Sequence, residues 1–261
     1  MVILGCDIGT GFTKAVVLKD GEFLYGTRVE TQARPNRAMK LAIENITAEK
    51  GLKADDFEDV VVTGWGQGKV SAKHETYKTA ATINCLARAA VWAEPACRSV
   101  LCMGTQQSVA LSVNDKGKVL RYMMNDKCAS GAGMFLQVIL EALGCSVDEC
   151  AGIAGSADKK LSMSSQCAVF AESEVVSLIN DGESPANIVS AILESLSKNL
   201  ASLCKKVNAK DALVLGGGLA NNDKIFELLQ GGLRKKLQVF QPKPDFIAAV
   251  GAALSANGGA K

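Results

Sequence analysis

The chain has 261 residues, 48% of them hydrophobic, and a formal net charge of +2. This length suffices for one large core or two smaller ones. The charge is spread without a basic run or an acidic tail, and no apolar stretch reaches the length of a bilayer span, so we expect no nucleic-acid partner and no membrane segment. The N-terminal residues lack the basic segment of a signal peptide, and we expect a cytoplasmic protein.

The sequence contains nine cysteines. An odd number without a secretion signal does not favour a disulfide framework. We expect most of them to be small buried residues, with some available as metal or cluster ligands. Their positions are Cys6, Cys85, Cys97, Cys102, Cys128, Cys145, Cys150, Cys167 and Cys204.

The first part of the chain predicts a unit of three strands followed by helices. Alternating and apolar runs, separated by glycine turns, predict strands at 1–7, 12–19 and 22–30. A helix is predicted at 35–50, with a proline near its start and a glycine after its end. A buried strand ending in glycines follows at 59–66, and then a helical stretch at 75–93.

The same pattern restarts 95 residues later, with strands predicted at 98–104, 108–113 and 118–124. In this register Gly104–Thr105 falls on Gly9–Thr10, whereas Cys102 falls on Asp7. Such self-similarity indicates an internal duplication. Two related α/β halves around a cleft are therefore expected.

Helices are predicted in the remainder of the second half at 131–143, 168–180, 185–207 and 222–236. An apolar strand with three glycines at 212–218 precedes the last of them, and a short strand follows it at 237–240. A final helix is predicted at 245–256, after the prolines at 242 and 244.

The turn "DIGTGFTK" has the composition of a phosphate-binding loop. Its glycines let the backbone approach a ligand, and Thr10, Thr13 and Lys14 add donors. Asp7, at the end of the first strand, can hold Mg²⁺ or its water. The alternative for this turn alone is a glycine-rich hairpin with a solvated lysine.

The second and third glycine turns strengthen the nucleotide interpretation. A second turn at Gly104–Thr105 would clamp phosphates from the opposite side of the cleft. A third, at Gly216, Gly217, Gly218 and Asn221, would pack against an adenosine and offer helix N–H groups. The Walker A and Rossmann patterns are both missing, so neither of those folds is indicated.

Cys128 and Cys167 each stand just ahead of a predicted helix, where N–H groups and the helix dipole stabilise a thiolate. Cys128 is followed by the glycine turn that contains Gly131. Two cysteines supply half of the four ligands of a [4Fe–4S] cluster, and a symmetric dimer would supply all four. The alternative is that they are two ordinary cysteines among nine.

Four segments together resemble the ATP-dependent activators of 2-hydroxyacyl-CoA dehydratases and the ATPase subunits of benzoyl-CoA reductases. They are "CDIGTGFTK", "NDKCASGAGMFL", "SSQCAVFAESEVVSLI" and "LVLGGGLANN", and the similarity runs from residue 3 to about 255. It implies two ribonuclease-H-like domains of the actin, Hsp70 and sugar-kinase fold. We assign 1–96 with 243–261 to the first domain and 97–242 to the second.

The resemblance also implies the cofactors, the partners and the reaction. Mg²⁺ and ATP or ADP would bind in the cleft, and Cys128 and Cys167 would hold a [4Fe–4S] cluster shared with a homologous ATPase subunit, in a homodimer or heterodimer. Hydrolysis would drive an electron, taken from a ferredoxin or flavodoxin, into an acyl-CoA reductase or dehydratase. A benzoyl-CoA reductase is favoured because "DIGTG" looks more like that branch.

The second turn departs from the family pattern D-I-G-G-Q-D. Gln106 is kept, and with Asp7 it is the predicted catalytic pair, but Cys102 and Gln107 replace both acids. A neutral side chain cannot hold Mg²⁺ or orient water as a carboxylate does. A non-hydrolysing nucleotide-binding subunit is therefore one alternative, and a small-molecule kinase of the same fold is another.

Overall fold

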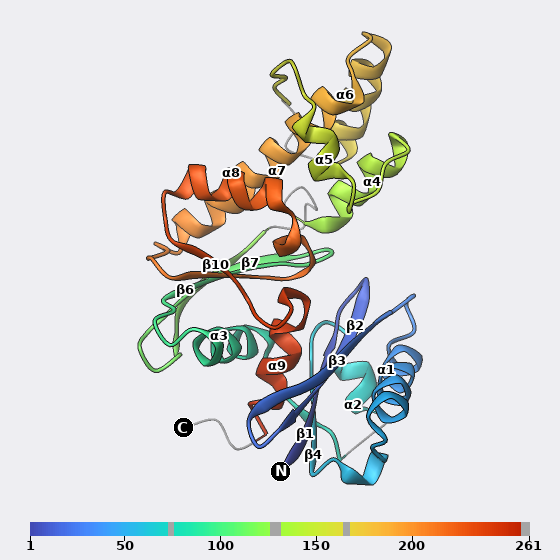
Figure 1. Ribbon diagram of the computed structural model, residues 1–261, viewed down its shortest axis with the longest axis vertical. Helices are drawn as coiled ribbons and strands as arrows, with labels where there is room; N and C mark the ends of the chain where they lie inside the picture. The colour runs from blue at the N-terminus through green and yellow to red at the C-terminus, as the bar shows by residue number, and fades with distance from the viewer. Residues whose placement is uncertain (73–75, 126–131, 164–167, 257–261) are drawn as a thin grey trace.

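The computed structural model describes residues 1–72, 76–125, 132–163 and 168–256, with the side chains of 168 and 169 left aside. Within these residues the chain forms two five-stranded sheets (Figure 1). The first sheet has the order β3-β2-β1-β4-β5. Its strands are β1 (Val2–Ile8), β2 (Phe12–Lys19), β3 (Glu22–Glu30), β4 (Asp59–Thr63) and β5 (Lys78–Thr79).

The second sheet repeats the first, with the order β10-β9-β6-β7-β8. Its strands are β6 (Ser99–Met103), β7 (Ser108–Val113), β8 (Val119–Met124), β9 (Leu213–Gly216) and β10 (Leu237–Val239). In both sheets the first three strands of the unit are antiparallel neighbours and the last two pair in parallel. The predicted duplication and the mixed α/β class are thereby confirmed.

The helices of the described residues flank and separate the two sheets. They are α1 (Pro35–Lys50), α2 (Gln67–Ser71), α3 (Thr82–Ala93), α4 (Gly133–Ala142), α5 (Cys150–Gly155), α6 (Ala168–Asn180), α7 (Pro185–Lys206), α8 (Asp223–Leu233) and α9 (Ile247–Ala253). The part of the chain that the structure describes also contains short 3₁₀ turns at η1 (Ala54–Asp56), η3 (Gly218–Asn221) and η4 (Pro244–Phe246).

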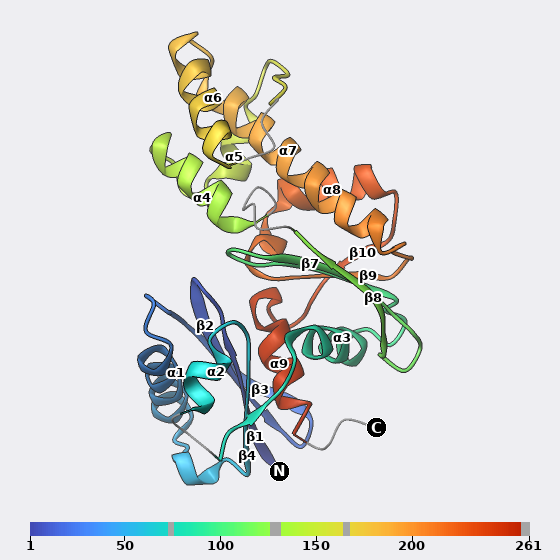
Figure 2. The same ribbon diagram turned by 180° about the vertical axis from the view of Figure 1, so that it is seen from behind.

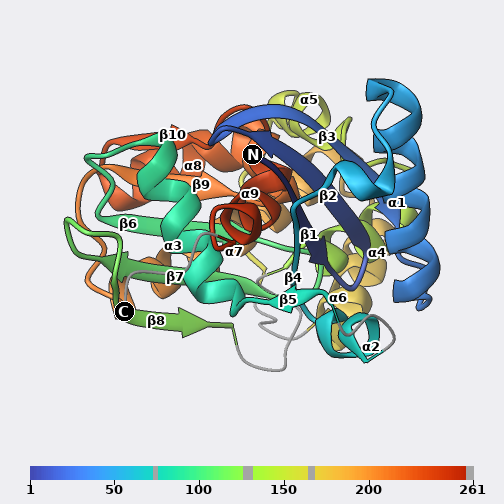
Figure 3. The same ribbon diagram turned by 90° about the horizontal axis from the view of Figure 1, so that it is seen from below.

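Each sheet is covered on both faces, which is why its central strands are almost continuously apolar. Helices α1 and α2 lie outside the first sheet, α7 and α8 lie outside the second, and α3 and α9 lie between the two sheets (Figures 1 and 3). Helix α9 packs on β1, β2 and β4, so the end of the chain returns to the first sheet. This packing is in line with the assignment of 243–261 to the first domain. The domain boundaries themselves stay a prediction.

Helices α4, α5 and α6 form a projection at the end of the molecule farthest from both termini (Figures 1 and 2). Helix α4 contacts α6, and α5 packs on α7 and α8. We call this projection the tip. It joins the second sheet through the start of α4 and through the long helix α7.

The stretch at 75–93 is not one helix. Lys78–Thr79 form β5, which pairs in parallel with β4, and the helix begins only at Thr82. The Thr82 hydroxyl accepts a hydrogen bond from the Gly64 amide at 3.1 Å, and the Thr63 hydroxyl donates to the Ala80 carbonyl at 2.7 Å. These bonds hold the segment extended along β4 before the helix starts.

The short helices α2 and α5 were not expected from the sequence, and Trp65, just before α2, is 64% exposed. No helix within the described ranges has the length and apolar composition needed to cross a bilayer.

Candidate nucleotide site at the turn junction

The first glycine turn joins β1 to β2, and its ends are fixed by the antiparallel pairing of the two strands. The Gly9 amide donates to the Phe12 carbonyl at 3.1 Å, which closes the turn. The Gly11 carbonyl accepts from the Thr31 amide at 2.9 Å, which fixes the turn to the end of β3. Thr10 lies at the partly exposed crest of the turn.

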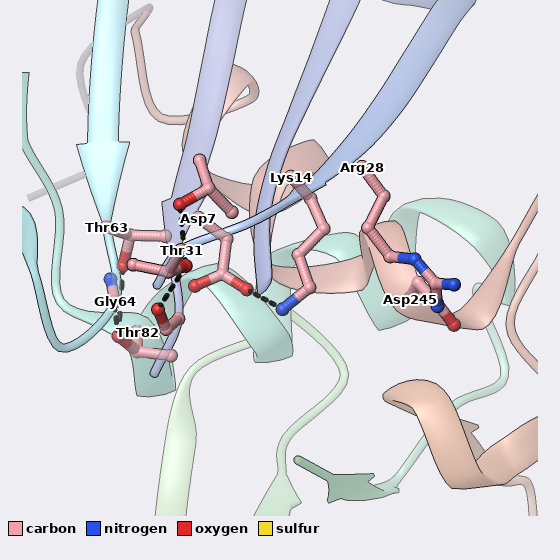
Figure 4. Close-up of polar contacts among 10 residues, drawn as sticks. Asp7, Lys14, Arg28, Thr31, Thr63, Gly64, Thr82 and Asp245 are labelled. Carbon is pink, nitrogen blue, oxygen red and sulfur yellow. Dashed lines mark hydrogen bonds and ion pairs between the residues drawn. The ribbon is translucent and has the colours of Figure 1, made fainter. Parts of the chain in front are cut away.

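Thr13 differs from the expectation that its hydroxyl would face a phosphate. Its side chain is fully buried, and its hydroxyl is 3.0 Å from that of Thr31. The Thr31 hydroxyl in turn donates to the Gly9 carbonyl at 2.8 Å (Figure 4). This pair supports the turn from inside and leaves its outer face to Thr10 and Gly11.

Asp7 and Lys14 form an ion pair below the turn, with Lys14 Nζ 2.9 Å from Asp7 Oδ2 (Figure 4). Their side chains are only 12% and 17% exposed, so the alternative of a solvated lysine is wrong. Burial lowers the pKa of the Lys14 ammonium, but the charge and hydrogen bond of Asp7 outweigh it, and the net pKa is raised. The Lys14 ammonium is therefore charged at neutral pH.

The ion pair is part of a row of charges that crosses three strands on one face. Asp7 is opposite Lys14 in the β1–β2 pairing, and Lys14 is opposite Arg28 in the β2–β3 pairing. Residues opposite one another in a sheet share a face. The row ends at Asp245 in η4, whose Oδ2 accepts from Arg28 Nη1 at 2.8 Å (Figure 4).

The second glycine turn joins β6 to β7 and has the same internal bond as the first. The Gly104 amide donates to the Gln107 carbonyl at 3.0 Å. The two turns meet: a Cβ on Gly11 would lie 2.7 Å from Thr105 Oγ1. Gln106 is exposed beside this contact.

Cys102 occupies in the second sheet the position that Asp7 has in the first. Burial and then the charge of Asp7 raise the pKa of its thiol to about 12. A neutral thiol supplies neither the negative charge nor the oxygen ligand that Mg²⁺ prefers. The loss of the acid at this position is therefore a real chemical difference between the two turns.

The third glycine turn lies against the second. Gly217 has a φ of +86°, and a Cβ there would collide with the Met103 carbonyl. Its amide donates to the Pro244 carbonyl at 2.8 Å, which ties the turn to η4. Gly218 is exposed, and a Cβ on it would point into open space, while Asn221 is exposed at the end of η3.

We call the region formed by 7–14, 102–107 and 216–218 the turn junction. It brings together the predicted residues of all three turns from distant parts of the chain. Three predicted residues, Cys128, Gly131 and Cys167, lie outside the described residues.

The residues that sequence reasoning missed are Arg28 and Asp245. They are 217 residues apart and meet only because α9 returns to the first sheet. One sequence feature could have pointed to Asp245: it is the acid in "PKPDF", which follows two prolines and precedes a helix.

The two repeated sheets place this protein in the class of two-lobed α/β proteins with the actin-like and sugar-kinase fold. The family described as the BadF/BadG/BcrA/BcrD ATPase family matches residues 4–256, and the chain belongs to it. The resemblance seen in the sequence is thus confirmed.

Two curated relatives cover almost the whole chain. An activator of lactoyl-CoA dehydratase from Anaerotignum propionicum is 32% identical over 98% of this chain and 97% of the relative. One of the subunits of benzoyl-CoA reductase from Thauera aromatica is 35% identical over 97% of this chain and 92% of the relative.

Solved structures agree with the fold. The activator of 2-hydroxyisocaproyl-CoA dehydratase from Clostridium difficile, with bound ADPNP, has a TM-score of 0.90, 31% identity and coverage of 98% of this chain and 94% of its own. A ROK family glucokinase from Streptomyces griseus has a TM-score of 0.61 and 16% identity over 98% of this chain and 99% of its own, which is a likeness of fold alone.

Proposed function

We propose that this chain binds Mg-ATP at the turn junction and couples its hydrolysis to low-potential electron transfer into a partner acyl-CoA dehydratase or reductase. Family membership and the two kinds of relatives support this coarse function. They support the dehydratase and the reductase equally. The finer proposal of a benzoyl-CoA reductase subunit therefore rests on sequence features alone, among them the "DIGTG" turn.

In this proposal the three turns divide the nucleotide among them. Backbone N–H groups and hydroxyls of the first two turns hold the phosphates. Asp7 would hold Mg²⁺ through its water, and Gln106 would orient the attacking water. The proposed phosphate ligands are Gly9, Thr10, Gly11, Lys14, Gly104, Thr105 and Gly131, and the proposed adenosine contacts are Gly216, Gly217, Gly218 and Asn221.

The proposed [4Fe–4S] cluster is held by Cys128 and Cys167 of two subunits, and it would supply a one-electron carrier at the tip. Each cysteine precedes a described tip helix, α4 or α6. Among the described cysteines, burial raises the pKa of Cys97 to about 11 and that of Cys204 to about 12. Both of these thiols are fully buried in the described part of the chain, and the proposal gives neither of them a role at the cluster.

The observation that carries the proposal is the direct connection between the second turn and α4. The Gly133 amide donates to the Gly104 carbonyl at 2.9 Å, and the Met134 amide donates to the Thr105 carbonyl at 2.7 Å. These are the first two amides of α4, which have no partner within their own helix. A change in the turn on hydrolysis would therefore move the helix that follows Cys128.

The test is anaerobic purification followed by iron analysis and an ATPase assay. We expect a brown protein with about four irons per two chains, because one cluster would be shared. Cys128→Ala and Cys167→Ala should each lose the iron and keep nucleotide binding. Colourless protein without iron would contradict the electron-transfer role.

A second candidate, a non-hydrolysing nucleotide-binding subunit, is favoured by the protonated thiol of Cys102. Cys102→Asp combined with Gln107→Asp discriminates between the two. A large gain in hydrolysis over an inactive native protein would support the second candidate, and normal hydrolysis by the native protein would exclude it.

A further inference from the structure

Asp245 has a buried carboxylate oxygen without a partner. Its Oδ2 pairs with Arg28, but Oδ1 is buried and has no hydrogen bond to any described residue. A buried carboxylate oxygen left in this state costs free energy. An unsatisfied group in an otherwise paired site indicates an absent ligand, such as a water or an ion.

The place of Asp245 relates it to the turn junction. Pro244, its neighbour, accepts the Gly217 amide of the third turn at 2.8 Å. Ile247, two residues further along the chain, packs against Gly216, which is paired with Cys102 across β9 and β6. Asp245 therefore stands at the end of the charged row, in the 3₁₀ turn that packs on β9, and β9 is the neighbour of the strand that carries Cys102.

The electrostatics agree with this position. For the Lys14 ammonium, burial is the largest influence and lowers the pKa. Asp7 raises the pKa, and the charge of Asp245 raises it further. For the Cys102 thiol, burial and Asp7 again come first, and Asp245 also raises the pKa. One carboxylate thus acts on both the first turn and the residue that lacks its acid.

Resting on the function proposed above, we propose that Asp245 supplies the second carboxylate of the nucleotide site, in place of the acid missing at Cys102. Its Oδ1 is the atom that would accept a hydrogen bond from a water bound to Mg²⁺. A carboxylate commonly holds Mg²⁺ through such water, because the ion gives up its water reluctantly. Asp245 is in this role a positioning residue.

The competing explanation is structural. Asp245 pairs with Arg28 and stands where a helix begins, and both features stabilise an acid by themselves. This explanation accounts for Oδ2, but it leaves Oδ1 buried and unpaired. The two explanations differ in what happens when Arg28 is removed and the carboxylate is kept.

The experiment measures the Mg²⁺ dependence of nucleotide binding, by titrating Mg²⁺ into protein with a fluorescent ATP analogue. Asp245→Asn should weaken the apparent Mg²⁺ affinity by about 10- to 100-fold, the usual effect of losing a partner that supports a metal. Arg28→Gln, the matched control, removes the same ion pair and should stay close to the native value. Cys102→Asp added to Asp245→Asn should restore the affinity.

Each result decides the inference. Equal losses in Asp245→Asn and Arg28→Gln, or a native Mg²⁺ affinity in Asp245→Asn, would overturn it and leave the proposed function standing. No Mg²⁺-dependent nucleotide binding by the native chain would overturn the proposed function, and the inference with it. If Asp245→Asn does not fold, Asp245→Glu replaces it in the experiment. The longer side chain displaces the carboxylate, so the Mg²⁺ affinity should change. An unchanged Mg²⁺ affinity in Asp245→Glu would overturn the inference.

Discussion

The ion pair of Lys14 and Asp7 gives the first turn a stability that depends on pH. The folded-state pKa of Lys14 is raised above the ordinary value of 10.5. Its contribution is therefore fully present below pH 10.5 and is lost as the pH rises through the higher folded value. Lys14→Met should lower the free energy of unfolding by about 1.5–3 kcal/mol at pH 7, measured by urea denaturation.

The same loss should shrink when the denaturation is repeated above pH 10.5. Lys40→Met is the control, since Lys40 is 3.7 Å from Glu44 on an exposed helix face. Exposed pairs of this kind contribute well under 1 kcal/mol. A Lys14→Met loss as small as that of Lys40→Met would contradict the description of Lys14 as a buried partner.

Gly217 and Gly218 are adjacent glycines with opposite environments. Gly217 has a positive φ and abuts the Met103 carbonyl, whereas Gly218 faces open space. Gly217→Ala should destabilise the fold by more than about 1 kcal/mol through backbone strain and collision. Gly218→Ala should change stability by about 0.5 kcal/mol at most. Thermal unfolding measures both, and equal effects would contradict this geometry of the third turn.

Sequence reasoning found Asp7 and Lys14 because both lie in one glycine-turn motif, but it did not predict their ion pair. A tight turn between antiparallel strands fixes which residues are opposite one another. Arg28 and Asp245 were not found, since their contact depends on the return of α9 to the first sheet. Thr13 was found as a turn residue, but which way its hydroxyl faces depends on Thr31.

At the scale of elements, the start of α4 is the connection between nucleotide and tip. Gly133 is the first residue of α4, and Ala132 before it is extended, with φ −137° and ψ 162°. Proline suits such a first helical position, and an extended residue suits the position before proline. Gly133→Pro therefore removes one N–H donor to the second turn and keeps the helix.

We expect Gly133→Pro to bind ATP. The effect of Mg-ATP on the rate of iron removal from the cluster should be smaller than in the native protein by about fivefold or more. The measurement is the rate at which a chelator removes iron, with and without Mg-ATP. Gly133→Ala keeps the N–H group, and its Cβ would lie at an ordinary 3.5 Å from the Gly104 carbonyl. An unchanged effect of Mg-ATP in Gly133→Pro would contradict coupling through this bond.

The duplicated strands were predictable because their apolar runs and glycine turns are repeated in the same order. The helix expected at 75–93 was wrong in its first part, because pairing of Lys78–Thr79 with β4 prevails over the local preference of the segment. Such pairing depends on a strand that lies earlier in the chain and has no local signal. The tip could be predicted as helices but not as a projection.

At the scale of the whole molecule, the tip exposes large apolar side chains. They are Met134 and Val138 on α4 and Phe170, Val176 and Ile179 on α6. Exposed large apolar side chains on neighbouring helices are typical of an interaction site when they form one patch. These side chains support the proposed contact with a second ATPase subunit at the cluster.

Phe170 is 68% exposed and is the most exposed of these side chains. Phe170→Glu should weaken a dimer by about 10- to 100-fold, since burying a phenylalanine contributes about 1.5–3 kcal/mol. Sedimentation equilibrium under anaerobic conditions measures this. Leu24→Glu on β3, which is 41% exposed and far from the tip in sequence, is the control. Equal weakening by both, or by neither, would contradict a dimer formed at the tip.

The proposed function depends above all on hydrolysis of ATP at the turn junction by means of Asp7. The rate of ATP hydrolysis should therefore be compared between the anaerobically purified native protein and Asp7→Asn. We expect hydrolysis by the native chain and a loss of about 100-fold or more in Asp7→Asn, because the charge that holds Mg²⁺ is removed. Hydrolysis at the native rate by Asp7→Asn would show that the turn junction does not work in this way.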